Sequence, residues 1–307
     1  MTRRALLAGA ATTAMPAPSN RILDPHFHVY ERDPRFPFWK GNPTHPTDDK
    51  TPEMLIDLMR ANGVAKNVLI RVRHYLFDNS YLLHVLKKYP HYFEGVCRVN
   101  PESPDAPEHL SELTQAGIRG VRLSPAANAS GDWIRGPLMK PLWKRCEQLQ
   151  VPMNILAPIS RMPDIGAPID QFPDLTIVID HMADCPVDQP AELEKLIALK
   201  RHPMLFVKVS HTWSLSRQAY PWRDAQDGGT PRMDGRPGWM DAQEHVKRLH
   251  AAFGPQRLMW GTDWPVSLPH ATYPQTLAVV RDEMKFLNED DKHWMLSKTI
   301  ERVWPFA

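Results

Sequence analysis

The chain has 307 residues, of which 42% are hydrophobic, so it is long enough for one large domain or two ordinary ones. Its 37 basic and 35 acidic residues leave a net charge of +2 without any block of like charge, which argues against nucleic-acid binding. No apolar run reaches the roughly 20 residues that span a bilayer, and three cysteines without metal-type spacing do not indicate a disulfide framework.

The first 20 residues differ in composition from the rest of the chain. Arg3 and Arg4 precede a short stretch of small and apolar residues that ends near Ala17, and this order resembles a twin-arginine export signal. The stretch is short and leads almost directly into the first expected strand, so a flexible arm is the alternative. We therefore divide the chain into residues 1–20, a signal or an arm, and one domain over 21–307. A cytoplasmic location is favoured over a periplasmic one.

Short apolar runs alternate with amphipathic stretches along the domain. In the first amphipathic stretch, for example, Leu55 and Met59 recur at helical spacing. Strands are expected near Ile22 and at 64–72, 93–99, 118–123, 151–156, 175–180, 205–209 and 257–261. Helices are expected at 53–62, 79–89, 106–116, 138–149, 191–199, 241–253, 273–287 and 290–303.

This alternation predicts an α/β fold, a (β/α)8 TIM barrel. Strands that alternate with helices pair in parallel, and eight such units in about 290 residues have the size of that barrel. A doubly wound sheet would need a glycine-rich phosphate loop after an early strand, and the sequence has none. Residues 31–50 and 215–239, after the first and seventh strands, are expected to be long loops on the C-terminal face, where barrel enzymes keep their active sites.

Histidines and an aspartate stand at the ends of three expected strands. His26 and His28 end the first strand and point the same way, because residues i and i+2 share a face. His181 ends the sixth strand and Asp263 the eighth, so all four should meet at one rim of the barrel. Imidazole and carboxylate suit zinc, manganese or iron. A metal there would polarise a carbonyl or acidify water, with Asp263 as ligand, as general base, or as both.

Further polar residues near strand ends are candidates for binding the substrate. Arg71 and Arg73 end the second expected strand and Arg122 the fourth. An arginine fork binds a carboxylate with two hydrogen bonds, which suggests an anionic substrate; pairing with an acidic side chain is the alternative. The residues predicted to bind substrate are Arg71, Arg73, Tyr75, Arg122, Asn154, Ser210 and His211.

The segment Asp24-Pro25-His26-Phe27-His28 resembles the opening signature of the amidohydrolase superfamily, and more narrowly its lactonase-type branch, amidohydrolase 2. Residues 178–181 and 259–265 support the resemblance, which runs over about residues 21–306. It implies a TIM-barrel hydrolase in which His26, His28 and His181 bind a metal or the substrate carbonyl. Asp263 would then activate the hydrolytic water and later deliver its proton to the leaving oxygen.

The resemblance implies that the substrate is a lactone or related cyclic ester, carboxylated or derived from a sugar acid. The alternative is a metal-dependent decarboxylase of the same superfamily. A barrel that only binds is disfavoured, because it has no reason to keep all four residues at strand ends. The expected partner is this small molecule, with no nucleic acid and no membrane span; a homo-oligomer stays open.

The expected cofactor is one divalent metal, or none. Binuclear members of the superfamily carry a lysine on one strand and another histidine on the next, whereas the fifth strand here offers Asn154, a poor metal ligand. Zinc is favoured over manganese. Some lactonases of this branch are thought to work without a metal, with the histidines contacting the substrate directly.

Overall fold

The computed structural model describes residues 21–42, 44–124, 132–218 and 238–306. The expected signal or arm at residues 1–20 lies outside the described residues, as does most of the expected loop at 215–239. Among the described residues, no helix combines the length and the apolar character needed to cross a membrane.

Eight strands form one sheet in chain order, and every neighbouring pair is parallel. They are β1 (Ile22–Phe27), β2 (Val64–Ile70), β3 (Phe93–Cys97), β4 (Gly120–Leu123), β5 (Met153–Ile155), β6 (Ile177–Ile179), β7 (Leu205–Val209) and β8 (Leu258–Trp260). Each strand falls within one of the eight predicted runs.

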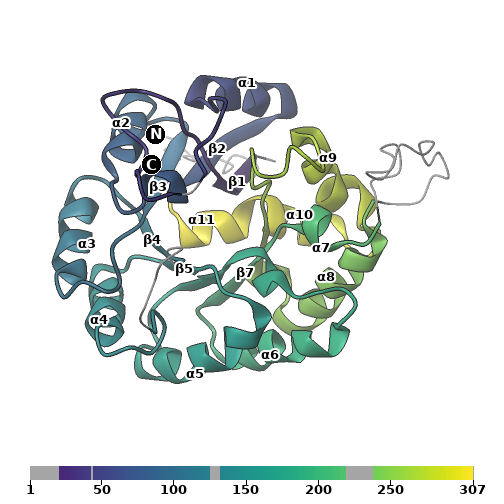
Figure 1. The fold of residues 1–307 in the computed structure, drawn as a ribbon. Helices are drawn as coiled ribbons and strands as arrows, with labels where there is room; N and C mark the ends of the chain where they lie inside the picture. Colours follow the sequence, from purple (N-terminus) through teal and green to yellow (C-terminus); the bar gives the residue numbers. More distant parts are fainter. Residues whose placement is uncertain (1–20, 43, 125–131, 219–237, 307) are drawn as a thin grey trace, which may run out of the picture.

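The sheet closes on itself where β1 meets the segment that follows β8. The Asp263 amide donates to the His26 carbonyl at 2.9 Å, and the His28 amide donates to the Trp264 carbonyl at 2.7 Å. These bonds complete the circle, with helices on the outside (Figure 1). The predicted TIM barrel is therefore confirmed, and its closure sets Asp263 beside the two histidines of β1.

Helices follow most strands and cover the outside of the barrel. They are α1 (Pro52–Asn62), α2 (Ser80–Lys88), α3 (Ala106–Gln115), α4 (Met139–Leu149), α5 (Met162–Gln171), α6 (Glu194–Ile197), α7 (Thr212–Leu215), α8 (Met240–Phe253), α9 (Tyr273–Ala278), α10 (Glu289–His293) and α11 (Thr299–Val303).

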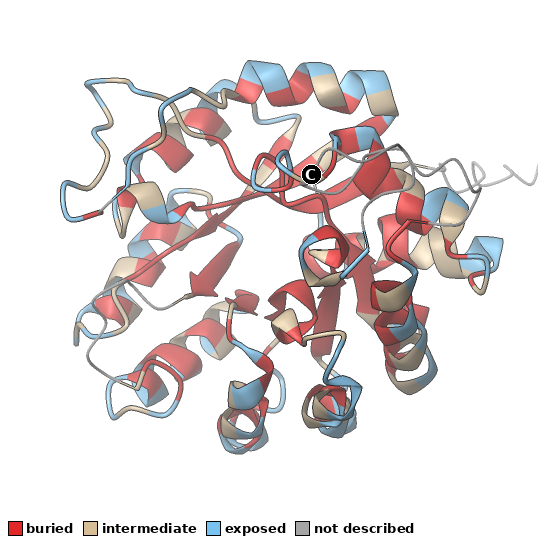
Figure 2. Ribbon diagram, turned by 45° about the vertical axis from the view of Figure 1, so that its right-hand side comes forward, coloured by how far each residue is buried: buried red, intermediate tan, exposed pale blue. Residues whose placement is uncertain are grey.

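The chemistry of α1 shows why the sequence forms these helices. The Thr51 hydroxyl accepts from the amide of Met54, and Pro52 occupies the first turn, where an amide hydrogen would have no partner. Gly63 ends the helix with a φ of 70°, a conformation that favours glycine. The strands are almost entirely buried, and most helices turn buried residues toward them (Figure 2).

The sequence did not predict α5 and misjudged the last helices. Pro168 lies inside α5, and an interior proline normally argues against a helix. The predicted helix over 191–199 is only the short α6 with a 3-10 turn on each side. Turns of π-helix at Val279–Glu283 and Trp294–Lys298 interrupt the C-terminal helices.

Candidate active site

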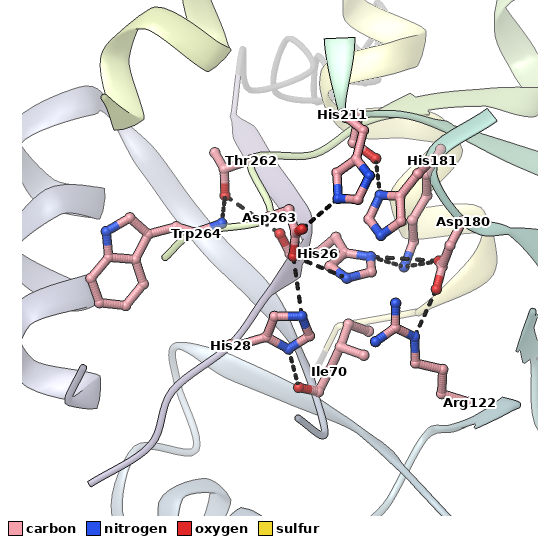
Figure 3. A network of polar contacts seen from close by, with 12 residues as sticks. His26, His28, Ile70, Arg122, Asp180, His181, His211, Thr262, Asp263 and Trp264 are labelled. Carbon is pink, nitrogen blue, oxygen red and sulfur yellow. Dashed lines mark hydrogen bonds and ion pairs between the residues drawn. The ribbon is translucent and has the colours of Figure 1, made fainter. Parts of the chain in front are cut away.

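Four side chains from three strand ends converge at the C-terminal rim of the barrel (Figure 3). Asp263 Oδ1 lies 3.5 Å from His26 Nε2 and 3.1 Å from His28 Nε2. The ring centroids of His26 and His181 are 4.5 Å apart. All four residues are buried. The structure therefore brings together the set that the sequence placed at one rim.

A buried carboxylate beneath the site fastens the first and last strands to each other. Asp24 accepts from the His26 amide at 3.1 Å, the Thr262 hydroxyl at 2.6 Å and the Tyr273 hydroxyl at 3.2 Å. Burial, opposed by these hydrogen bonds, raises the pKa of Asp24 to about 6. Gly261 allows the close approach, because a Cβ there would lie 3.2 Å from the Cβ of His26.

Two of the histidines are held through their Nδ1 atoms. His28 Nδ1 lies 2.7 Å from the carbonyl oxygen of Ile70, and because a carbonyl only accepts, this nitrogen carries the hydrogen. Its Nε2 faces Asp263. His181 Nδ1 lies 2.8 Å from the hydroxyl of Ser210. Burial and the neighbouring His211 lower the pKa of His181 well below its usual value, so this ring is neutral.

The donor set fits a divalent cation. His26 Nε2 and Asp263 Oδ1 are buried and lack a hydrogen-bond partner within the described ranges. His26, His181 and Asp263 each offer a ligand atom, and these atoms lie within 4.8 Å of one another. Burial raises the pKa of Asp263, but the hydrogen bond from His211 outweighs it and holds the pKa well below its usual value. Neutral imidazoles with an ionised carboxylate are typical zinc ligands.

His211, predicted to bind substrate, is bonded to Asp263 in the structure. Its Nε2 lies 2.6 Å from Asp263 Oδ2 and its Nδ1 lies 2.9 Å from Asp184 Oδ1. Burial lowers the pKa of His211, but the hydrogen bonds to Asp184 and Asp263 outweigh burial and raise it to about 9. The ring is therefore an imidazolium near neutrality. It stacks on the ring of His181 at a centroid distance of 3.5 Å.

A left-handed turn after β6 orients His181 and Asp184. Its four residues, His181 to Asp184, have φ values of 54°, 53°, 55° and 46°. Non-glycine residues avoid this region, at a cost of about 1–2 kcal/mol each in a left-handed helix. None of the four is glycine, so no signal in the sequence indicated the turn, and the role of Asp184 was missed.

A second charged cluster lies directly behind His26. Lys208 on β7 is fully buried, with its Nζ 3.0 Å from His26 Nδ1 and 3.1 Å from Asp180 Oδ1. Arg122 Nε donates to Asp180 Oδ2 at 2.9 Å. Arg122, predicted to bind substrate, thus also has the acidic partner that was its alternative. The sequence did not assign Lys208 or Asp180 to the site. Lys208 stands two residues before Ser210, and because such residues share one face of a strand, this spacing could have indicated Lys208.

The pKa values in this cluster follow from burial and charge. Burial, opposed mainly by Asp180, lowers the pKa of Lys208 to about 8. Burial and the charge of Lys208 lower the pKa of His26 to about 3, so that ring is neutral. Burial raises the pKa of Asp180, but Lys208 and Arg122 outweigh it and hold the pKa well below its usual value.

Two further polar side chains lie near Arg122. Asn154 is paired in register with Arg122 on the neighbouring strand, is buried, and has no hydrogen-bond partner for its side-chain amide among the described residues. Burial and the charge of Arg122 lower the pKa of Arg98 to about 10. Arg98, which follows β3, was not among the residues predicted from the sequence. Together they form a cationic, hydrogen-bonding region beside the histidines.

Arg71 and Arg73 lie close enough to Arg98 to interact with its charge. Among the described residues, however, neither they nor Tyr75 forms a hydrogen bond or ion pair with Arg122 or the four rim residues. The prediction that the second strand reaches residue 72 is wrong: β2 ends at Ile70, and a 3-10 turn begins at Arg73. Arg71 Nε donates to the carbonyl of Asp78 at 2.7 Å, and its guanidinium lies 3.7 Å from the Tyr75 ring centroid. Arg73 is exposed. Without a strand, the two arginines do not share an inward face.

Comparison with known proteins identifies a family and several similar proteins. A family model described as amidohydrolase matches residues 23–306. L-fucono-1,5-lactonase of Burkholderia ambifaria is 27% identical over 253 residues, which cover 80% of each chain. 4-Sulfomuconolactone hydrolase of Hydrogenophaga intermedia is 24% identical over 247 residues, covering 80% of this chain and 74% of the relative.

Among solved structures, an amidohydrolase from Burkholderia multivorans with bound zinc superposes with a TM-score of 0.74. The two sequences are 19% identical, and the match covers 94% of this chain and 100% of that one. At this identity the likeness establishes the barrel fold.

Proposed function

The chain belongs to the amidohydrolase family, and on that premise we propose that it is a hydrolase that opens a lactone or related cyclic ester, preferably one that carries a carboxylate. The observation that carries the proposal is the position of Asp263, a buried, ionised carboxylate with one oxygen held by His211 and the other facing His26 and His28. The names of the two relatives, both of which describe lactone hydrolysis, support this choice.

Asp263 acts as the general base. Its Oδ2 accepts from His211, which leaves Oδ1 to take a proton from a water molecule. The water oxygen attacks the ester carbonyl carbon and forms a tetrahedral intermediate. The ring carbon–oxygen bond then breaks, and Asp263 returns the proton to the departing oxygen, so that the product is a hydroxy acid.

The histidines provide the electrophilic side of the reaction. His26, His28 and His181 surround the position that the carbonyl oxygen would take, and a ring N–H directed there by His26 or His181 would stabilise the developing negative charge. A divalent metal held by these histidines and Asp263, zinc before manganese, would supply Lewis-acid polarisation of the carbonyl.

Arg122 binds the carboxylate of the substrate in this proposal, assisted by Arg98 and Asn154. Two observations support the proposal. The side-chain amide of Asn154 is buried without a partner among the described residues, and the Arg98 guanidinium lies close enough to Arg122 for the charge of Arg122 to lower the pKa of Arg98. Buried polar groups normally have partners. A substrate carboxylate would supply them.

The test is an assay of the purified full-length chain against a panel of carboxylated and sugar-acid lactones, with metal content measured on the same samples. We expect ring opening, seen as acid release, fastest for carboxylated lactones. Release of carbon dioxide from an unsaturated acid, without lactone hydrolysis, would contradict the proposal. Activity lost on chelation and restored by zinc would show that the metal is required.

A further inference from the structure

Two groups compete for the Nδ1 atom of His26. Lys208 Nζ lies 3.0 Å from this nitrogen and Asp180 Oδ1 lies 3.5 Å from it. The two groups require opposite forms of the neutral ring. An ammonium can only donate, which leaves the ring hydrogen on Nε2, whereas a carboxylate can only accept, which requires the hydrogen on Nδ1.

The geometry favours Lys208. Its contact with His26 is the shorter one and has hydrogen-bond geometry. Asp180 Oδ1 lies farther from His26 Nδ1, at 3.5 Å against 3.0 Å for Lys208 Nζ, and it is itself paired with Lys208 at 3.1 Å. Because an ammonium has three hydrogens, Lys208 can donate to the imidazole nitrogen and still pair with the Asp180 carboxylate.

Lys208 has little freedom to turn away. It lies on β7, between the paired strands β6 and β8, and its side chain is completely buried. The ring centroid of Trp304, from the C-terminal end of the chain, lies 5.4 Å from its Nζ. Its position is fixed by the barrel rather than by the loops that line the rim.

We propose that Lys208 is a positioning residue that holds His26 in the tautomer with its hydrogen on Nε2. His26 then presents an N–H donor to the carbonyl oxygen of the substrate. The same tautomer weakens metal binding, because a metal ligand must offer a lone pair at Nε2. The catalytic meaning rests on the proposed function, whereas the tautomer does not.

His28, two residues after His26, has the opposite tautomer. His28 donates its Nδ1 hydrogen to the Ile70 carbonyl, so its Nε2 offers a lone pair. The two histidines thus present opposite groups to Asp263 Oδ1. The 3.5 Å separation between His26 Nε2 and that oxygen is long for a hydrogen bond, which leaves the His26 N–H available to a ligand.

The first test needs no variant of Lys208. Nitrogen-15 NMR of the histidine rings in the chelated, full-length protein reports the tautomer, with the His26 signals assigned by their loss in His26→Gln. We expect His26 to carry its hydrogen on Nε2 and His28 on Nδ1. A hydrogen on Nδ1 of His26 would overturn the proposal.

The second test compares two variants that each remove one positive charge beside Asp180. In Lys208→Met, Asp180 becomes the sole partner of His26 Nδ1, so we expect the hydrogen to move to Nδ1. Zinc should then bind about tenfold tighter or more, measured by competition with a chromophoric chelator, because a carboxylate partner favours a metal-ligating histidine.

Arg122→Met is the matched control, because Arg122 contacts Asp180 but makes no contact with His26 Nδ1. We expect its His26 tautomer to be unchanged. An equal tautomer shift in both variants, or none in Lys208→Met, would overturn the proposal. Should Lys208→Met fail to fold, the NMR measurement on the unaltered chain decides. Neither measurement uses a substrate, so a failed lactone assay would refute the proposed function and leave this result standing.

Discussion

The two sides of the barrel rim use polar residues in different ways. On the side of β1, β6, β7 and β8, charged side chains and imidazoles bond mainly to one another, as Lys208, His26 and Asp180 do. On the side of β2 and β3, arginines bond to backbone carbonyls: Arg71 to Asp78 and Arg98 to Ser124. The side chains nearest His26 are therefore positioned by one another, whereas Arg71 and Arg98 are positioned by the backbone.

The Asp263→Asn substitution should have the largest effect on the first side. It removes the base but keeps the shape, so we expect turnover to fall about 10³-fold, within the range for general-base catalysis. Thermal unfolding should remain cooperative but shift to a lower temperature, because the buried His211 imidazolium loses one of its carboxylate partners. Asp57→Asn, an exposed carboxylate on α1, is the control. Near-normal turnover in Asp263→Asn would refute the general-base assignment.

The Arg122→Met substitution tests the residue that joins the two sides. Charged hydrogen bonds contribute about 1.5–3 kcal/mol, so we expect kcat/KM for a carboxylated lactone to fall about 10- to 100-fold. A neutral lactone should lose much less, since it has no carboxylate for Arg122 to bind. An equal loss for both lactones would show that Arg122 acts only through Asp180.

The pH dependence of stability should reveal the raised pKa of His211. Its pKa is about 9 in the folded chain, against about 6.5 in the unfolded chain, so its contribution is complete below pH 6.5 and is lost as the pH rises through 9. Between pH 6.5 and 8 the His211 contribution to the free energy of unfolding of the metal-free protein should fall by up to about 2 kcal/mol. His26, His74 and His181, whose pKa values are lowered, act in the opposite direction. Above pH 8 Lys208 acts in the opposite direction, because its pKa is lowered.

The control for this measurement is His211→Gln, followed by urea unfolding over the same pH range. Asp24, with a pKa of about 6, titrates mostly below the window and contributes equally in both proteins. The variant should lack the decline. If both proteins show the same slope, His211 is not the group that titrates.

The smallest effect on activity should come from Arg71→Met on the other side. Its guanidinium is occupied by the Asp78 carbonyl, so we expect KM and kcat to change less than about threefold, and the free energy of unfolding to fall by about 1.5 kcal/mol. Steady-state kinetics and urea unfolding measure the two quantities. A tenfold rise in KM would show that Arg71 binds the substrate, as the sequence suggested.

The same contrast explains what the sequence could and could not predict. Strand ends converge in any closed barrel, so the convergence of His26, His28, His181 and Asp263 followed from strand assignment alone. The hydrogen-bond partners of these residues could not be predicted from strand assignment. The bonds of His211 depend on a left-handed turn that no glycine marks, and Arg71 turned away because β2 ended at Ile70.

The left-handed turn from His181 to Asp184 also limits how this protein can be engineered. Four residues in that region represent about 4–8 kcal/mol of conformational strain, comparable with the entire net stability of many domains. Ala183→Gly would relieve part of it and should raise the melting temperature. The same change would make the backbone that orients His181 and Asp184 more flexible. A gain in thermal stability at this position should therefore be accompanied by a less precise arrangement of the reacting groups.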